Sequence, residues 1–268
     1  MTISLGILCK NGVVLASDGM ASLNFQDSEG RSYNFMGLDN LKVHIVDNKF
    51  ICAFAGDDAI MKHFVTSLER YLSEKWLLPK DPNILVGEVC SSFIKYYHKI
   101  HDSYPEELKA KILKEFDTQI ENGSLALLLG FYIGNNFYLY QTERNLQFSI
   151  VREGCTWYKI IGSGWFVGNP CISLINKLLN VKSMPSVDEA LIIAHWTIQH
   201  TIDSSSGGVG GDVTIAFLKK DDNGFTIDYC DVADYREHLI HLYNHIHSFT
   251  KDINEIVKDG RIEEIPKL

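Results

Sequence analysis

TISLGILCKNGVVLASDG, residues 2–19, is the stretch of sequence that decides the fold of this chain. It contains two short apolar runs, 3–8 and 13–17, which are separated by Lys10, Asn11 and Gly12. Apolar runs of this length around a glycine-bearing turn are typical of a β-hairpin. Such a hairpin would hold the start of the chain rigidly in a sheet, with Thr2 at its open end.

Thr2 directly follows the initiator Met1, and this position gives the threonine a special chemistry. Methionine aminopeptidases remove Met1 when a small residue such as threonine follows, so exposing Thr2 needs no propeptide. A free Thr2 carries a hydroxyl and an α-amine on adjacent atoms. The amine titrates near ~7.7–8, so it can act as the base for its own side chain. Threonine is also an ordinary residue at the start of a strand, so Thr2 alone decides nothing.

Further segments supply the groups that such a nucleophile needs. Asp18 ends the second apolar run, and Lys42 opens a third strand that is followed by FICAFAG, residues 50–56, ending at Gly56. In IGSG, residues 161–164, a strand turns into a helical stretch. In IDSSSGGVGGDVTIAFL, residues 202–218, a helix ends in a glycine-rich turn that leads into a strand.

Together these motifs resemble the proteasome β-subunit family, the N-terminal-threonine peptidases. The opening TIxxGxxxxxGVVLASD matches without a gap from Thr2 to Asp18, and Lys42 and Gly56 have the family's separation. IGSG matches the family's Gly-Ser-Gly turn, and DSSSGG, residues 203–208, matches its Asp-x-x-Ser-Gly-Gly signature. The resemblance covers roughly residues 2–218. The departures are a longer connection at 22–41, an extra helical stretch around 104–121 and a tail after residue 235.

The resemblance implies a catalytic role for several residues. Thr2 would be the nucleophile, and Lys42 would place a positive charge beside its hydroxyl, favouring loss of the proton. Asp18 would hold Lys42 charged and oriented, and Gly56 would donate its backbone N–H to the developing oxyanion. Taken singly, each residue also has an ordinary interpretation as a turn, strand edge, strand end or helix cap. The residues implied to position the α-amine and a water are Ser163, Asp203 and Ser206.

The resemblance also implies contacts with substrate by Ser22, Phe54 and Asp58. Phe54 stands two positions before Gly56, where the family has a wall of the pocket for the residue that precedes the cleaved bond. Because side chains alternate along a strand, Phe54 lies on the face opposite to Ala53. The alternative is that Phe54 fills the core between two sheets. A pocket with Phe54 as its floor would favour small or medium apolar residues over acidic ones.

Composition limits the classes of function. The chain has 268 residues, enough for one full core, and a net charge of −9, which argues against nucleic acid or anionic membranes as partners. No segment is typical of a signal peptide or reaches the ~20 apolar residues of a membrane span, so we expect a cytoplasmic protein. The six cysteines form no CxxC pair, which favours buried reduced thiols over disulfides or metal ligands. No cofactor is expected.

Hydrophobic periodicity predicts an α+β chain. Residues 187–201 form the clearest predicted helix. Ser186 lies directly before it and Glu189 lies in its first turn, and together they make a capping box. The resemblance implies that the elements form the four-layer αββα sandwich of the N-terminal nucleophile hydrolases. The other predicted helices are 57–76, 84–100 and 165–179, and the predicted strands after residue 56 are 124–133, 137–141, 148–151, 157–161, 213–218 and 225–229.

We expect a single domain over residues 1–268 with a C-terminal helical extension at about 235–268. The extension has an apolar stripe, which is typical of a helix that packs on its own domain or on a neighbouring subunit. Its four histidines suggest a metal site, but no acidic or cysteine ligand completes a set, so no metal is expected. These histidines are His238, His241, His245 and His247.

Three interpretations of function remain open. The first is a threonine endopeptidase in a self-compartmentalised homo-oligomer, a ring or stacked rings, acting on peptides or unfolded proteins. An ATP-dependent unfoldase or an adaptor would be its partner. The second is a non-catalytic structural subunit of the same fold. The third is an N-terminal-nucleophile amidase that acts on small amides.

Overall fold

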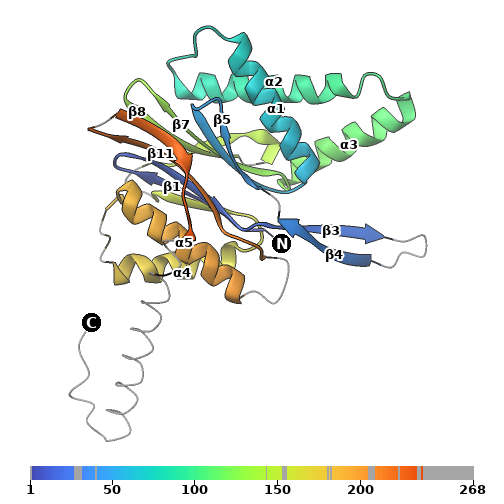
Figure 1. Ribbon diagram of the computed structural model, residues 1–268. Coiled ribbons are helices and arrows are strands. Elements are labelled where there is room, and N and C mark those ends of the chain that lie inside the picture. Colours follow the sequence, from blue (N-terminus) through green and yellow to red (C-terminus); the bar gives the residue numbers. More distant parts are fainter. Residues whose placement is uncertain are drawn as a thin grey trace, which may run out of the picture. The chain divides into compact units, whose positions relative to one another are not determined.

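The computed structural model describes residues 2–26, 32–39, 41–142, 144–152, 156–179, 181, 183–204, 209–222, 224–233 and 237, with 21–26 and 32–39 described as backbone only. The chain divides into two compact units, Met1–Cys230 and Asp231–Leu268. The helical extension expected at about 235–268 lies almost wholly outside the described residues, as do Met1 and Ser206. The described part of the first unit is α+β, with two five-stranded antiparallel sheets and five α-helices (Figure 1).

The predicted opening hairpin is confirmed. β1, Ser4–Cys9, pairs antiparallel with β2, Gly12–Ser17, and Ser4 lies opposite Ser17 at the open end of the hairpin. The hairpin is the centre of the first sheet, whose order is β10-β1-β2-β11-β12. The remaining strands of this sheet are β10, Tyr158–Ile161, β11, Thr214–Asp221, and β12, Gly224–Tyr229.

The second sheet has the order β5-β6-β7-β8-β9. Its first hairpin joins β5, Val43–Val46, to β6, Phe50–Ala55. Asp47 and Asn48 in the turn both have positive φ, 50° and 48°, as a tight turn between twisted strands requires. Lys42 lies immediately before β5. The other strands are β7, Ala126–Ile133, β8, Asn136–Thr142, and β9, Phe148–Ile150.

The segment at 22–41 was expected as a long connection, and that expectation is wrong. It contains two strands, β3, Met20–Gln26, and β4, Ser32–Asp39, which form a two-stranded sheet of their own (Figure 1). Because β3 and β4 pair with each other and with neither five-stranded sheet, they do not need the apolar runs that mark the buried strands. They contain polar residues, such as Asn24 and Asn34, which lie opposite each other. The sequence therefore lacks the apolar runs by which the other strands were predicted.

All four helices predicted in the first unit are confirmed, and so is the extra helical stretch. α1, Asp58–Glu74, begins after Asp57, whose carboxylate accepts hydrogen bonds from the N–H groups of Ala59 and Ile60. α5, Val187–Ser204, begins with the predicted capping box, because the Ser186 N–H donates to Glu189 Oε2 over 2.7 Å. The other helices are α2, Pro82–Ile100, α3, Glu106–Asn122, and α4, Trp165–Leu178.

The two sheets pack on each other, and each packs helices on its other face. Val13 and Leu15 of β2 share a buried cluster with Ile51 and Ala53 of β6, between the sheets. The opposite face of β6 packs against α1 and α2. α5 contacts β1 and β2, and α4 contacts β10 and α5 (Figure 1). Strands β1 and β2 are therefore buried on both faces, which rigidly fixes the start of the chain.

Among the described cysteines, Cys9, Cys52, Cys90 and Cys171 are free thiols, and Cys9, Cys52 and Cys90 are buried, as the apolar runs around them predicted. Burial raises the pKa of the Cys90 thiol to about 12, so this group stays protonated at neutral pH. In the described part of the chain, none of the helices combines the length and the apolar character that a membrane crossing requires.

Candidate active site

Thr2 lies directly before β1, against the turn that joins β10 to α4. The Gly164 N–H donates to the carbonyl oxygen of Thr2 over 3.0 Å, and the backbone nitrogen of Thr2 lies 3.3 Å from Ser163 Oγ. Gly162 has a φ of 86°, and a Cβ at this position would collide with the Thr2 carbonyl oxygen. The glycines of IGSG therefore let the turn close around Thr2, and Ser163 reaches the atom that would become the α-amine.

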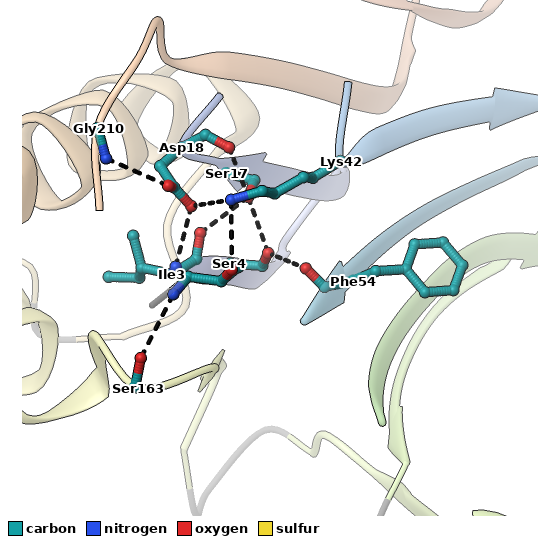
Figure 2. A network of polar contacts seen from close by, with 9 residues as sticks. Ile3, Ser4, Ser17, Asp18, Lys42, Phe54, Ser163 and Gly210 are labelled. Atoms are coloured by element: carbon teal, nitrogen blue, oxygen red, sulfur yellow. Dashed lines mark hydrogen bonds and ion pairs between the residues drawn. The ribbon is translucent and has the colours of Figure 1, made fainter. Parts of the chain in front are cut away.

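Lys42 and Asp18 form a buried ion pair (Figure 2). This pair lies beside the Thr2 hydroxyl. Lys42 Nζ lies 2.8 Å from Asp18 Oδ1 and 3.3 Å from Thr2 Oγ1. Asp18 is fully buried and Lys42 is 6% exposed, so the pair is shielded from bulk water. The structure thus brings together three of the residues that the sequence motifs placed in the site.

Asp18 is held by two backbone groups besides Lys42. The Ile3 N–H donates to Oδ1 over 3.0 Å, and the Gly210 N–H donates to Oδ2 over 3.3 Å (Figure 2). A buried carboxylate needs such donors, because an unpaired charge in the interior is strongly unfavourable. The sequence analysis missed both. The glycine-rich run at 207–211 was a signal for Gly210, whereas a backbone N–H such as that of Ile3 leaves no mark in a sequence.

Burial lowers the pKa of the Lys42 amine below its usual range, because it penalises the charged form. The negative charge of Asp18 and its hydrogen bond oppose this effect, and Asp58 adds a smaller contribution in the same direction. The charge state of Lys42 therefore depends on Asp18. This dependence agrees with the role that the sequence motifs implied for Asp18.

Gly56 follows β6 and has a φ of 137°, which favours glycine. Among the described residues, none accepts a hydrogen bond from its backbone N–H, and Gly56 is exposed, so this donor remains available to a ligand. A hydrogen bond across the two sheets links the strand before Gly56 to the start of the chain. Ser4 Oγ, two residues after Thr2, donates to the carbonyl oxygen of Phe54, two residues before Gly56, over 2.7 Å (Figure 2).

Asp203 lies apart from this group. It is exposed in the last turn of α5, and its carboxylate accepts a hydrogen bond from Gln199 Nε2 over 2.8 Å. The structure therefore gives it a contact within its own helix in place of the expected contact at the α-amine. Ser206, the other residue expected here, lies outside the described residues. Their catalytic roles stay predictions.

The three residues expected to contact substrate occupy different settings. Ser22 lies in β3, opposite Met36, and only its backbone is described. Asp58 starts α1, where Oδ2 pairs with Lys62 over 2.7 Å while Oδ1 is buried with no hydrogen bond to the described residues. The Oδ1 atom of Asp58 can therefore still accept a hydrogen bond, and Asp58 is near enough to affect the pKa of Lys42.

Phe54 is 4% exposed and belongs to the cluster between the second sheet and its helices. Its ring packs edge-on against Phe64 of α1, with ring centroids 5.4 Å apart, and lies near the ring of His44. The alternative that placed Phe54 between the two sheets is wrong, because strand alternation gives that face to Ile51 and Ala53. A contact between Phe54 and substrate stays a prediction.

These groups can perform nucleophilic catalysis. The Thr2 hydroxyl lies 3.3 Å from the Lys42 amine, and the Thr2 nitrogen lies beside the Ser163 hydroxyl. The available N–H of Gly56 follows β6 of the second sheet. In the described part of the chain, no group of three or more His, Cys, Asp or Glu side chains is arranged to hold a metal ion.

Comparison with solved structures supports the fold. The chain is similar to the Gly-1 mutant of Anbu from Hyphomicrobium sp. strain MC1, with a TM-score of 0.63 and 15% identity over 95% of this chain and 100% of that one. It is also similar to Anbu (ancestral beta-subunit) from Yersinia bercovieri, with a TM-score of 0.60 and 16% identity over 99% of each chain. No family model and no curated protein matches the sequence. At this identity, the likeness shows the fold alone.

The comparisons correct the family expected from the motifs. The resemblance was to proteasome β-subunits, whereas these structural neighbours are Anbu proteins, which are proteasome-like but form a distinct family. The motifs around Thr2, Lys42 and Ser163 are each only a few residues long. They therefore could not distinguish one of these families from another.

Proposed function

We propose that this chain is a threonine-type N-terminal nucleophile hydrolase that cleaves amide bonds in peptides or unfolded proteins. Removal of Met1 would convert the nitrogen of Thr2 from an amide into a free amine. The chain would then carry a nucleophile and a base on adjacent atoms. The fold that it shares with Anbu structures is consistent with this proposal.

The reaction follows from the positions of the groups. Thr2 Oγ1 attacks the substrate carbonyl, and its proton passes to the free α-amine of the same residue, with Ser163 Oγ beside that nitrogen. Lys42 stabilises the negative charge that develops on Oγ1, and the Gly56 N–H donates to the oxyanion. The C–N bond then breaks, and the leaving amine takes the proton. Water hydrolyses the ester left on Thr2 and regenerates the free hydroxyl.

A single observation carries this proposal: the 3.3 Å contact between Lys42 Nζ and Thr2 Oγ1, with Lys42 held by the fully buried Asp18. A buried ion pair contributes little net stability compared with apolar residues of the same size. Its position beside the hydroxyl of an N-terminal threonine therefore favours a catalytic role. A purely structural subunit would not need a buried charge at this place.

The test is covalent labelling. A β-lactone or epoxyketone should attach to Thr2 in protein produced natively, and peptide mass analysis should find both the adduct and the loss of Met1. Thr2→Ala should abolish labelling, whereas Thr66→Ala, a threonine on the surface of α1, should not change it. If the protein retains Met1 and still cleaves peptides at full rate, the proposed mechanism is wrong.

We also propose the four-layer αββα arrangement and a homo-oligomer as the setting of this activity. Helix packing on the outer faces of two stacked sheets supports the first. Exposed apolar residues along α4 support the second, since Phe166, Leu174 and Leu178 are each at least 50% exposed. Light scattering of the purified protein tests the oligomer, and a monomer at micromolar concentration would refute it. A cytoplasmic location and an unfoldase or adaptor partner stay predictions.

A further inference from the structure

A cavity of about 340 Å³ lies beside the turn that holds Thr2. Three segments line it: the end of α3 with the start of β7, the end of β8 with Arg144 of the 3₁₀ turn that follows, and the end of β10 with the start of α4. The described residues that line it include Arg144, Gln141, Asn122, Gly162 and Trp165. The mechanism proposed above makes no use of this space.

Two residues that line the cavity contact Thr2 or pair with the residue before Gly56. Gly162 lines the cavity and lies against the carbonyl oxygen of Thr2. Ala126, which also lines it, is paired in the sheet with Ala55, the residue before Gly56. None of the described lining residues comes from α1, where Phe54 packs. The cavity and the Phe54 ring thus have different surroundings among the described residues, and we assign the cavity to the leaving half of a substrate whose other half would contact Phe54.

The described lining is rich in hydrogen-bond donors. Arg144 is the only ionisable side chain among the described lining residues, and in the described part of the chain no carboxylate forms an ion pair with it. Asn122 Oδ1 already accepts hydrogen bonds from the N–H and hydroxyl of Ser124, so the amide presents its NH₂ end to a ligand. A guanidinium beside amide donors is suited to a carboxylate, which can accept two parallel hydrogen bonds from an arginine.

The backbone around Arg144 is fixed, which a specific contact requires. Arg144 opens a short 3₁₀ turn, Arg144–Leu146, in which Leu146 is 7% exposed and packs into the core beneath α3. Asn145 and Leu146 both have positive φ, 60° and 51°, an unusual conformation for residues other than glycine. Gly123 leaves room for the stem of Arg144, because a Cβ at 123 would come within 3.3 Å of Arg144 Cγ.

We propose that this cavity binds a carboxylate on the leaving-group side of the scissile amide, with Arg144 as the specificity-determining residue. The inference rests on the proposed function, because that function defines the leaving half. The preferred substrates are then amides whose amine half carries a carboxylate close to the cleaved bond. An acidic side chain and the α-carboxylate at the end of a short peptide both supply this group.

Equilibrium binding tests the proposal without turnover. Thr2→Ala protein is titrated with acetyl-Ala-Ala-Leu-Glu-amide, its Gln-amide analogue, and acetyl-Ala-Ala-Leu-Ala as the free acid and as the amide. The fluorescence of Trp165, which lines the cavity and is 55% exposed, reports binding. In a Trp165→Phe variant the fluorescence change should be lost, which identifies Trp165 as its source. The first pair of peptides detects a side-chain carboxylate and the second pair detects an α-carboxylate.

In at least one pair, the charged peptide should bind about tenfold or more tightly than its neutral partner, as a charge-assisted hydrogen bond predicts. Arg144→Gln should remove this preference and Arg144→Lys should keep part of it. Arg70→Gln, which changes an exposed arginine on α1, should leave it unchanged. Equal binding of charged and neutral peptides, or a preference that survives in Arg144→Gln, would overturn the proposal. The two proposals can fail separately. If the preference for charged peptides is observed but a β-lactone or epoxyketone does not label Thr2 of the natively produced protein, the proposed function is refuted and the carboxylate site is not.

Discussion

The carbonyl oxygen of Thr2 occupies the space where a side chain at Gly162 would stand. The same oxygen accepts a hydrogen bond from the Gly164 N–H over 3.0 Å. The turn at 162–164 therefore fits around Thr2 only if position 162 is glycine. This relationship leads to the first prediction.

Gly162→Ala should lower the free energy of unfolding by at least ~2 kcal/mol, since it combines a collision with a strained positive φ. It should also displace Ser163 from the nitrogen of Thr2 and reduce kcat/KM. Urea unfolding and peptide hydrolysis measure the two effects. Gly134→Ala is the matched control, because Gly134 has a φ of 58° with open space around it and should cost only about 1 kcal/mol. An equal loss of unfolding free energy in the two variants would contradict the predicted collision.

Lys42→Ala should reduce kcat/KM by at least ~10²-fold, because the charge beside Thr2 Oγ1 acts mainly in the transition state. It should also cost about 3–5 kcal/mol of stability, since Asp18 would be left as a buried carboxylate without its cation. Lys62→Ala, which removes an exposed ion pair with Asp58, should change stability by less than ~1 kcal/mol. Full activity in Lys42→Ala would exclude Lys42 from the mechanism.

Asp18→Asn should change the pH dependence of activity. The charge of Asp18 and its hydrogen bond raise the pKa of Lys42 against the lowering effect of burial, so their loss should lower that pKa further. If Lys42 acts in its charged form, the alkaline limb of the profile of kcat/KM should move to lower pH. Initial rates of the folded variant across pH 6–10 measure this. A limb that stays in place would mean that another group titrates there.

Ser186→Ala should cost about 1 kcal/mol, because it removes the hydroxyl of the capping box at the start of α5. The hydrogen bonds from the Ser186 N–H and Oγ lower the pKa of Glu189 below its ordinary value of 4.5. The folded-state pKa is thus the lower one. The contribution of Glu189 to stability is present above pH 4.5 and is lost as the pH falls through the folded-state pKa. Unfolding of Glu189→Gln and of the wild type should be measured across pH. The difference between their free energies of unfolding should shrink only below pH 4.5.

Phe54→Ala should destabilise the fold by about 3–5 kcal/mol, because the ring is buried against Phe64. If the ring also forms the floor of a substrate pocket, a fluorogenic peptide library should show cleavage after larger apolar residues in this variant. The wild type should favour small or medium apolar residues. An unchanged profile would assign Phe54 to packing alone.

Much of the fold could be predicted because burial imposes clear patterns. The strands β1, β2 and β6 are buried on both faces and appear as apolar runs, and the capping box at Ser186 is a purely local signal. The pair β3 and β4 could not be predicted, since neither strand joins a five-stranded sheet that would require apolar runs.

The sequence identified side chains of the candidate site, but it did not indicate the hydrogen bonds to the backbone. Short motifs identified Thr2, Asp18, Lys42 and Ser163, which the structure places together. The link from Ser4 to the carbonyl of Phe54 joins two sheets through one hydroxyl, and no local pattern encodes such a contact. The motif that identified Asp203 is not accompanied by a contact with Thr2 among the described residues, since its carboxylate accepts a hydrogen bond from Gln199 of its own helix, and its role stays a prediction.

The hydrogen bond from Gly210 to Asp18 spans 192 positions of the chain, and this separation has a consequence for biosynthesis. On the ribosome the N-terminus emerges first, so Met1 can be removed while most of the protein is still being made. At ~5–20 residues per second, roughly 10–40 s separate the synthesis of Asp18 from that of Gly210. During that interval the carboxylate lacks one of its backbone donors. The order of translation thus delays assembly of the site until the segment that contains Gly210 has been made.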